Sequence, residues 1–167
     1  MKKLLFIGLL FCGFTAFSNV PVDMNEVRSL YKEAVKSEDS CKELVKISSG
    51  FNEEKNPLML GYKGSATMLM AKHVFNPFTK MSYFKKGKQM LEKAIEVDEN
   101  NLELRFLRFN AQTNMPSFLG YNNSIENDKK FLLNGFSQIT EVNLKDFVLE
   151  GLKNSKYLTA DEKHRLK

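Results

Sequence analysis

The stretch Lys85–Asn101, KKGKQMLEKAIEVDENN, constrains the fold of this chain more than any other. Gly87, Leu91 and Ala94 follow one another at spacings of four and three residues, which places them on one face of a helix. The two small residues allow a neighbouring helix to come close, and Leu91 fills the groove between them. The polar run Asp98–Asn101 then ends the helix. The pattern predicts a helix packed tightly against a second helix.

This stretch resembles the second helix of a tetratricopeptide repeat and the turn after it. The helix before it carries Tyr62, Ala66 and Leu69, which match the aromatic, small and large apolar series of the repeat's first helix. Ser65 stands where that repeat usually has leucine, and Asn76–Thr79 is expected to be a longer break than the repeat allows. The resemblance, over residues 62–101, implies stacked antiparallel hairpins that bind a protein or peptide rather than catalyse.

A second stretch, RFLRFNAQTNMPSFLGY, covers residues 105–121. It resembles small exported bacterial proteins of unknown function. That resemblance implies a fold and export from the cytoplasm, and no activity.

The first residues have the features of a signal peptide. Lys2 and Lys3 precede an apolar run, Leu4–Phe17, that is shorter than the ~20 residues that span a bilayer. Small residues at positions 16 and 18 predict cleavage after Ser18 and a periplasmic or secreted protein. The alternative is a lipoprotein attached through Cys12, although the residue before this cysteine is not small.

The remaining residues, 19–167, have the length of one domain. The net charge of the whole chain is +5, and removal of the two signal-peptide lysines lowers it by two. Basic and acidic residues are interspersed, so we expect no nucleic-acid binding. No second apolar run is long enough to cross a membrane. Cys41 is the single cysteine of the mature chain, so no intramolecular disulfide can form.

Apolar residues recur at helical spacing through this domain, and no segment alternates as a strand would. The sequence therefore predicts an all-α protein of seven or eight helices, arranged as antiparallel hairpins in a short tetratricopeptide-like array. The expected helices span 24–37, 39–50, 57–74, 82–97 and 102–114, and three more follow the caps Ser124, Asn143 and Thr159.

The fifth expected helix supplies the candidate site. It is apolar on two sides and leaves a narrow stripe of Arg105, Arg108 and Gln112. Two interpretations remain open. In the structural one, a carboxylate of this helix or the next neutralises the arginines; the candidates are Glu103, Glu126 and Asp128. In the functional one, the stripe lines a groove and receives an acidic ligand such as a peptide carboxylate.

The loop after this helix, Met115–Asn123, is too apolar for an exposed connection. Its apolar residues either fold back onto the core around a turn at Gly120, or Phe118 and Tyr121 form an apolar shelf beside the arginines. The predicted partner-binding residues are therefore Arg105, Arg108, Gln112, Phe118 and Tyr121.

Residues typical of catalytic or metal centres are not grouped in the sequence. The two histidines, His73 and His164, are far apart and lack ligands at metal-binding spacing. We expect no metal, no cofactor and no catalytic residue, and a non-catalytic binding or scaffold function with a protein or peptide partner, an acidic one included. The alternatives are an envelope enzyme that uses Arg105, Arg108 and Asp128 on an anionic substrate, and a structural subunit of an envelope complex.

Overall fold

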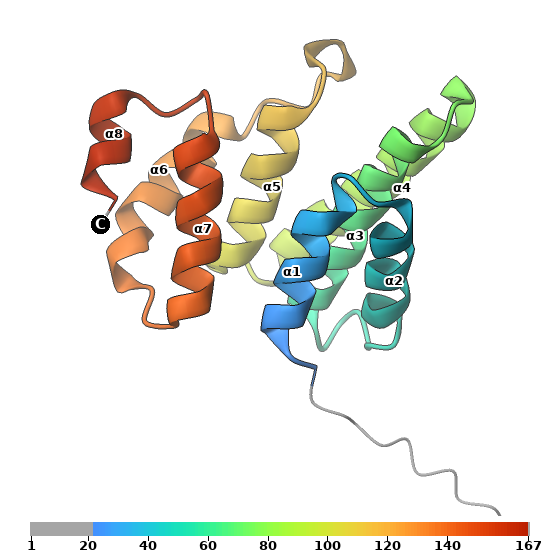
Figure 1. Cartoon of the computed structure of the whole chain (residues 1–167), viewed down its shortest axis with the longest axis horizontal. Coiled ribbons are helices and arrows are strands. Elements are labelled where there is room, and N and C mark those ends of the chain that lie inside the picture. The colour runs from blue at the N-terminus through green and yellow to red at the C-terminus, as the bar shows by residue number, and fades with distance from the viewer. Residues whose placement is uncertain (1–21, 167) are drawn as a thin grey trace, which may run out of the picture.

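The computed structural model describes residues 22–166, and the predicted signal peptide and Cys12 lie outside these residues. The described part is all helical, with eight α-helices, two short 3-10 helices and no strand (Figure 1). The prediction of an all-α fold with seven or eight helices is therefore confirmed. The elements are α1 Met24–Ala34, α2 Glu38–Ser49, α3 Pro57–His73, α4 Pro77–Val97, α5 Leu102–Asn114, η1 Ser117–Leu119, α6 Ile125–Gly135, η2 Phe136–Gln138, α7 Val142–Asn154 and α8 Ala160–Arg165.

Local sequence explains most helix starts. The carboxylate of Asp23 accepts a hydrogen bond from the Asn25 N–H at the start of α1. Thr159 and Glu162 form a reciprocal capping box at the start of α8. Such side chains satisfy backbone N–H groups that have no partner within the helix.

The expected break at Asn76–Thr79 was wrong, because α4 begins at Pro77 rather than at Ser82. The side chain of Asn76 accepts hydrogen bonds from the N–H groups of Phe78 and Thr79. Proline suits the first helical position, where no N–H is needed. The α3–α4 connection is therefore only residues 74–76, and α4 extends by more than a turn beyond its expected length.

Smaller differences concern three other helix ends. The first helix ends at Ala34, and Ser37 caps α2 by accepting from the Ser40 N–H. The seventh helix begins at Val142, before the expected cap Asn143.

Two glycines bring α3 and α4 into close contact. A methyl group added at Gly64 would lie 2.7 Å from the Gly87 carbonyl oxygen, and one at Gly87 would lie 2.7 Å from the Met68 backbone nitrogen. Both obstacles are backbone atoms, so neither can move aside cheaply. Leu91 and Ala94 are fully buried on the same face of α4. The tight helix contact predicted at Gly87 is thus present.

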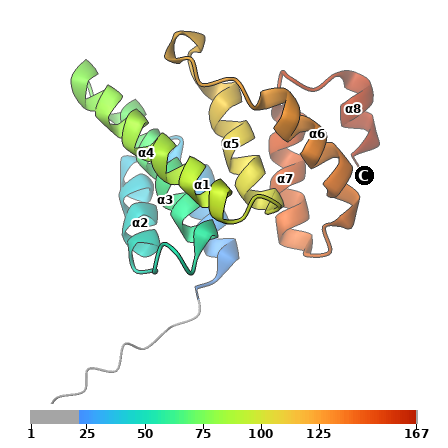
Figure 2. The same ribbon diagram turned by 180° about the vertical axis from the view of Figure 1, so that it is seen from behind.

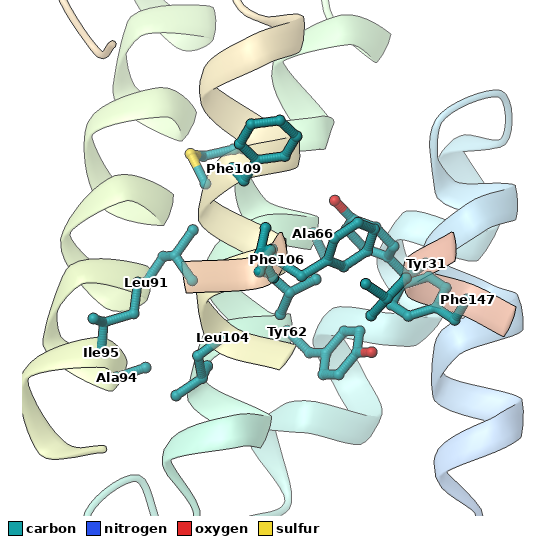
Figure 3. Packing of buried hydrophobic residues seen from close by; sticks show 14 of the residues in the cluster. Tyr31, Tyr62, Ala66, Leu91, Ala94, Ile95, Leu104, Phe106, Phe109 and Phe147 are labelled. Atoms are coloured by element: carbon teal, nitrogen blue, oxygen red, sulfur yellow. The ribbon is translucent and has the colours of Figure 1, made fainter. Parts of the chain in front are cut away.

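The fifth helix is the centre of the molecule. In Figures 1 and 2, α5 lies between a group formed by α1 to α4 and a group formed by α6, α7 and α8. It contacts α3, α4, α6 and α7. The aromatic rings of Tyr31, Phe106 and Phe147 meet edge to face in the core around it, with centroid separations of 5.9 Å for Tyr31–Phe147 and 5.0 Å for Phe106–Phe147 (Figure 3).

A smaller cluster of Ala34, Cys41 and Met70 joins α1, α2 and α3. The Cys41 thiol is fully buried and donates weakly to the carbonyl oxygens of Ala34 and Ala66. Burial raises the pKa of this thiol to about 11, which keeps it protonated and unreactive near neutral pH. Cys41 therefore acts as a small core residue.

Among residues 22–166, no helix has both the length and the apolar character needed to span a membrane.

Candidate functional site

Arg108 of α5 is paired inside the protein. Its Nε and Nη2 atoms donate to the two carboxylate oxygens of Asp128 in α6, at 2.7 and 2.8 Å. Asp128 is completely buried, and Arg108 is nearly so. Arg105 adds a third hydrogen bond to Asp128, at 3.1 Å, and donates a second to the Glu99 carbonyl oxygen. One carboxylate thus holds both arginines of the predicted stripe.

The remaining nitrogen of Arg108 reaches α4. Its Nη1 atom donates to Glu92 at 2.8 Å, and Glu92 also accepts a hydrogen bond of 2.5 Å from the Tyr121 hydroxyl. Burial and this hydrogen bond raise the pKa of Tyr121 well above its usual range. The network of Glu92, Arg108, Tyr121 and Asp128 therefore connects α4, α5, α6 and the loop before α6.

The other two predicted site residues have different environments. Gln112 is buried, and its side-chain oxygen accepts the Ser124 N–H at 3.2 Å. Phe118, in contrast, is 84% exposed, although Leu119 beside it packs against the core. Gly120 forms the turn with a φ of +61°, which glycine adopts without strain. Part of the apolar loop thus folds onto the core, and Phe118 projects from it.

The three carboxylates that the sequence offered as counter-charges have three different partners. Asp128 pairs with both stripe arginines, whereas Glu126 pairs with Lys129 on the surface. Glu103 binds Arg28 of α1 through two hydrogen bonds of 2.8 and 2.9 Å. Arg28 is a buried cation that sequence reasoning missed, because one arginine on a helix of ordinary amphipathic pattern gives no sign of burial.

A groove of about 750 Å³ lies on the outer side of this network, between α4 and η1. Phe118 lines it, and the other four predicted site residues do not. Tyr121 supports it from behind, because its ring meets that of Phe84 edge to face at 6.0 Å. The lining residues are Met81, Phe84, Lys85, Lys88, Gln89, Glu92, Lys93, Glu96, Phe118 and Leu119.

The part of the groove lined by Met81, Lys85, Lys88 and Phe118 is both apolar and basic. Met81 and Phe118 expose apolar surface there, next to Lys85 and Lys88. Neither of these lysines forms an ion pair with a residue in the described part of the chain. The Lys88 ammonium lies 4.8 Å from the centre of the Tyr121 ring, a position that favours a cation over the ring face.

Sequence reasoning missed the α4 side of the groove. One signal was present: residues 55–91 contain seven lysines and no aspartate or glutamate. Lysines on a helix are by themselves typical of a solvated face, and the expected helix start at Ser82 leaves Met81 outside the helix. With α4 beginning at Pro77, Met81, Lys85 and Lys88 fall on one helical face.

Within residues 22–166, no three metal-ligating side chains lie close enough to hold an ion. The ring of His73 contacts the Ala34 carbonyl oxygen at 3.0 Å, so it links the end of α3 to the end of α1. The groove has the features of a binding surface: apolar area for contact, and cations to orient an acidic ligand.

Comparisons of the chain with protein-family models, with curated proteins and with solved structures found no match.

Proposed function

We propose that this protein is an exported, non-catalytic binding protein that takes an acidic, amphipathic segment of a partner protein into the groove between α4 and η1. The observation that carries the proposal is the combination of Met81, Phe84 and Phe118 with Lys85 and Lys88 in one groove. Apolar side chains of the partner would pack on Phe84 and Phe118, and its carboxylates would form ion pairs with the two lysines. An amphipathic helix in a groove is a common mode of peptide recognition.

The network behind the groove supports this proposal because it fixes the wall before a ligand binds. Glu92 is bonded to Arg108 and to the Tyr121 hydroxyl, and Tyr121 packs on Phe84. A groove held in its binding geometry loses little conformational entropy when it is occupied. In this account Arg108 and Tyr121 contribute to binding by holding the groove, and Phe118 contacts the partner directly.

The tetratricopeptide resemblance favours the same function. Stacked helical hairpins generally offer grooves to protein segments. The resemblance rests on Gly87, Leu91 and Ala94, and in the structure Gly87 lies against the backbone of α3 while Leu91 and Ala94 are buried beside it. Two lysines followed by the apolar run 4–17 are the basis for proposing export and cleavage near Ser18.

Two alternatives make different predictions. An envelope enzyme acting through Arg105, Arg108 and Asp128 would need these groups to reach a substrate, whereas Asp128 has no exposed surface. A structural subunit would form a stable oligomer, and its contact would bury Phe118 permanently.

The test uses a photoreactive amino acid, benzoylphenylalanine, in place of Gln89, an exposed residue of the groove. The matched control carries the same group in place of Asn134, which is exposed on α6 and lines no part of the groove. Both proteins are irradiated in intact cells, and cross-linked peptides are sequenced by mass spectrometry. A synthetic copy of the cross-linked segment then competes in a second irradiation.

The proposal predicts a cross-link that forms from Gln89 and not from Asn134, to a segment rich in carboxylates and apolar residues. Its synthetic copy should abolish the cross-link. A cross-link to a second copy of this chain would favour the structural subunit instead. Equal yields from both positions, or a basic segment, would contradict the proposal.

A further inference from the structure

Exposed aromatic side chains are concentrated at one end of the molecule. The α3–α4 connection, the segment around η1 and the α7–α8 connection all lie at the upper end in Figures 1 and 2. Phe75 and Phe78 are 98% and 84% exposed at the first of these, Phe118 is 84% exposed at the second, and Tyr157 is 37% exposed at the third. We call this end, formed by residues 74–80, 115–124 and 155–159, the aromatic end.

The two ends of the molecule also differ in charge. The aromatic end contains Lys80 and Lys156 and no carboxylate. The connections at the other ends of the same helices contain acidic residues: Glu53 and Glu54 before α3, Asp98 and Glu99 after α4, and Glu141 before α7. The large apolar residues exposed there, Val97 and Val142, are aliphatic.

We propose that the aromatic end docks on the surface of an anionic lipid bilayer. Aromatic side chains favour the zone between water and hydrocarbon, where the ring lies among headgroups and upper acyl chains. Lysines near an anionic surface contribute about 1 kcal/mol each, which is about fivefold in affinity. Aromatic tips beside cations, with no carboxylate among them, therefore fit an anionic membrane.

The helices that begin at this end do bring carboxylates near it, and part of their charge is neutralised. Glu38 in the first turn of α2 pairs with Lys42. Glu126 in the first turn of α6 and Glu162 in α8 both pair with Lys129. Glu38, Glu126 and Glu162 lie in the first turns of these helices. Phe75 and Phe118 lie in the connections, and Phe78 is the second residue of α4.

Membrane docking and peptide binding in the groove are separate proposals, although Phe118 belongs to both surfaces. Phe75 and Phe78 do not line the groove, and Lys85 and Lys88 lie outside the aromatic end as defined. Variants at Phe75 and Phe78 therefore test the membrane claim alone.

The experiment measures binding of the mature chain, residues 19–167, to vesicles made of equal parts phosphatidylglycerol and phosphatidylcholine, by co-sedimentation. Vesicles of pure phosphatidylcholine are the lipid control. The test variant is Phe75→Ser/Phe78→Ser, and the matched control is Val97→Ser/Val142→Ser at the opposite end. All four residues are exposed, so thermal unfolding should show that both variants fold like the wild type. Lys80→Glu/Lys156→Glu tests the contribution of charge.

We expect binding to the anionic vesicles, a roughly tenfold or greater loss of affinity in the phenylalanine variant, and no loss in the valine variant. The lysine variant should also bind more weakly, and salt should weaken binding of the wild type. Equal affinity for both lipid mixtures, equal losses in both serine variants, or no binding would overturn the proposal. So would a dimer in solution that the phenylalanine variant dissociates, because the aromatic end would then be a contact between copies.

Discussion

Arg108 and Asp128 form a bidentate ion pair in which the carboxylate has no contact with solvent. The pair crosses from α5 to α6, twenty residues apart in the sequence. It joins the central helix to the carboxyl-terminal group of helices and, through Glu92, to α4. The Arg108 guanidinium therefore connects α6 to α4, the helix that forms one wall of the groove.

Replacing Asp128 with asparagine should destabilise the protein by on the order of 3 kcal/mol. The change keeps the size of the side chain but leaves Arg108 buried without its full counter-charge, which is costly. Urea unfolding at neutral pH measures the difference. The control is Glu126→Gln on the same helix. It removes the exposed Glu126 carboxylate from Lys129, which keeps Glu162 as a partner, and should cost less than about 1 kcal/mol. Equal effects of the two substitutions would contradict this account of the network.

Gly87→Ala should destabilise the protein by about 3 kcal/mol. Alanine is the better helix former, so a gain would be expected at an exposed site. At Gly87, however, the new methyl group meets the backbone of α3. Gly135→Ala is the comparison, because its methyl group would meet the movable end of the Leu102 side chain. Thermal unfolding should rank Gly87→Ala as much the more damaging; the reverse order would show that α3 and α4 are not in close contact.

Ser65→Ala should stabilise the fold by about 1 kcal/mol. The Ser65 hydroxyl is buried and has no hydrogen-bond partner among the described residues. Its removal relieves a desolvation cost and improves helix propensity. Ser49→Ala is a useful reference, since that hydroxyl is exposed and bonded to the Val45 carbonyl oxygen. A melting temperature that falls with Ser65→Ala would mean that the hydroxyl has a partner.

Stability should fall as pH rises above 10, and Tyr31 should contribute to the fall. Burial raises the pKa of Tyr31 from 10.0 to about 12. Between these values the unfolded chain loses the tyrosine proton and the folded chain keeps it, so alkali favours unfolding. In Tyr31→Phe, the free energy of unfolding should decline less steeply over this range, by up to about 1.4 kcal/mol per pH unit. Identical slopes for variant and wild type would contradict the assignment.

The helices were largely predictable because their signals are local. Pro57 and Thr159 mark helix starts through the chemistry of the first turn, and both mark the starts found. Asn76 and Pro77 carry the same chemistry, but an asparagine followed by a proline is also typical of a break between helices. Proline is found both at the first position of a helix and just after a helix end, and the side chain of the asparagine before it is the cap that starts α4.

The candidate site was harder to predict because its partners are distant in the sequence. Asp128 was one of three possible counter-charges, and nothing local distinguishes it from Glu126 two residues earlier. Phe118 and Tyr121 are both aromatic residues of one apolar loop, and the sequence does not distinguish them. In the structure Phe118 is exposed, whereas Tyr121 is only 3% exposed. The turn at Gly120 separates their environments, and its direction depends on how α5 and α6 pack. Helix packing, which the sequence does not specify directly, also creates the groove.

The most direct test of the central claim reverses charge in the groove. Lys85→Glu/Lys88→Glu is compared with Lys130→Glu/Lys153→Glu, a variant of equal net charge whose altered residues are exposed and line no part of the groove. Each pair is introduced into the protein that carries benzoylphenylalanine at position 89, and the yield of cross-linked partner is measured. We predict that the first pair abolishes the cross-link and that the second leaves it intact. Equal yields from both variants would contradict recognition of an acidic segment in this groove.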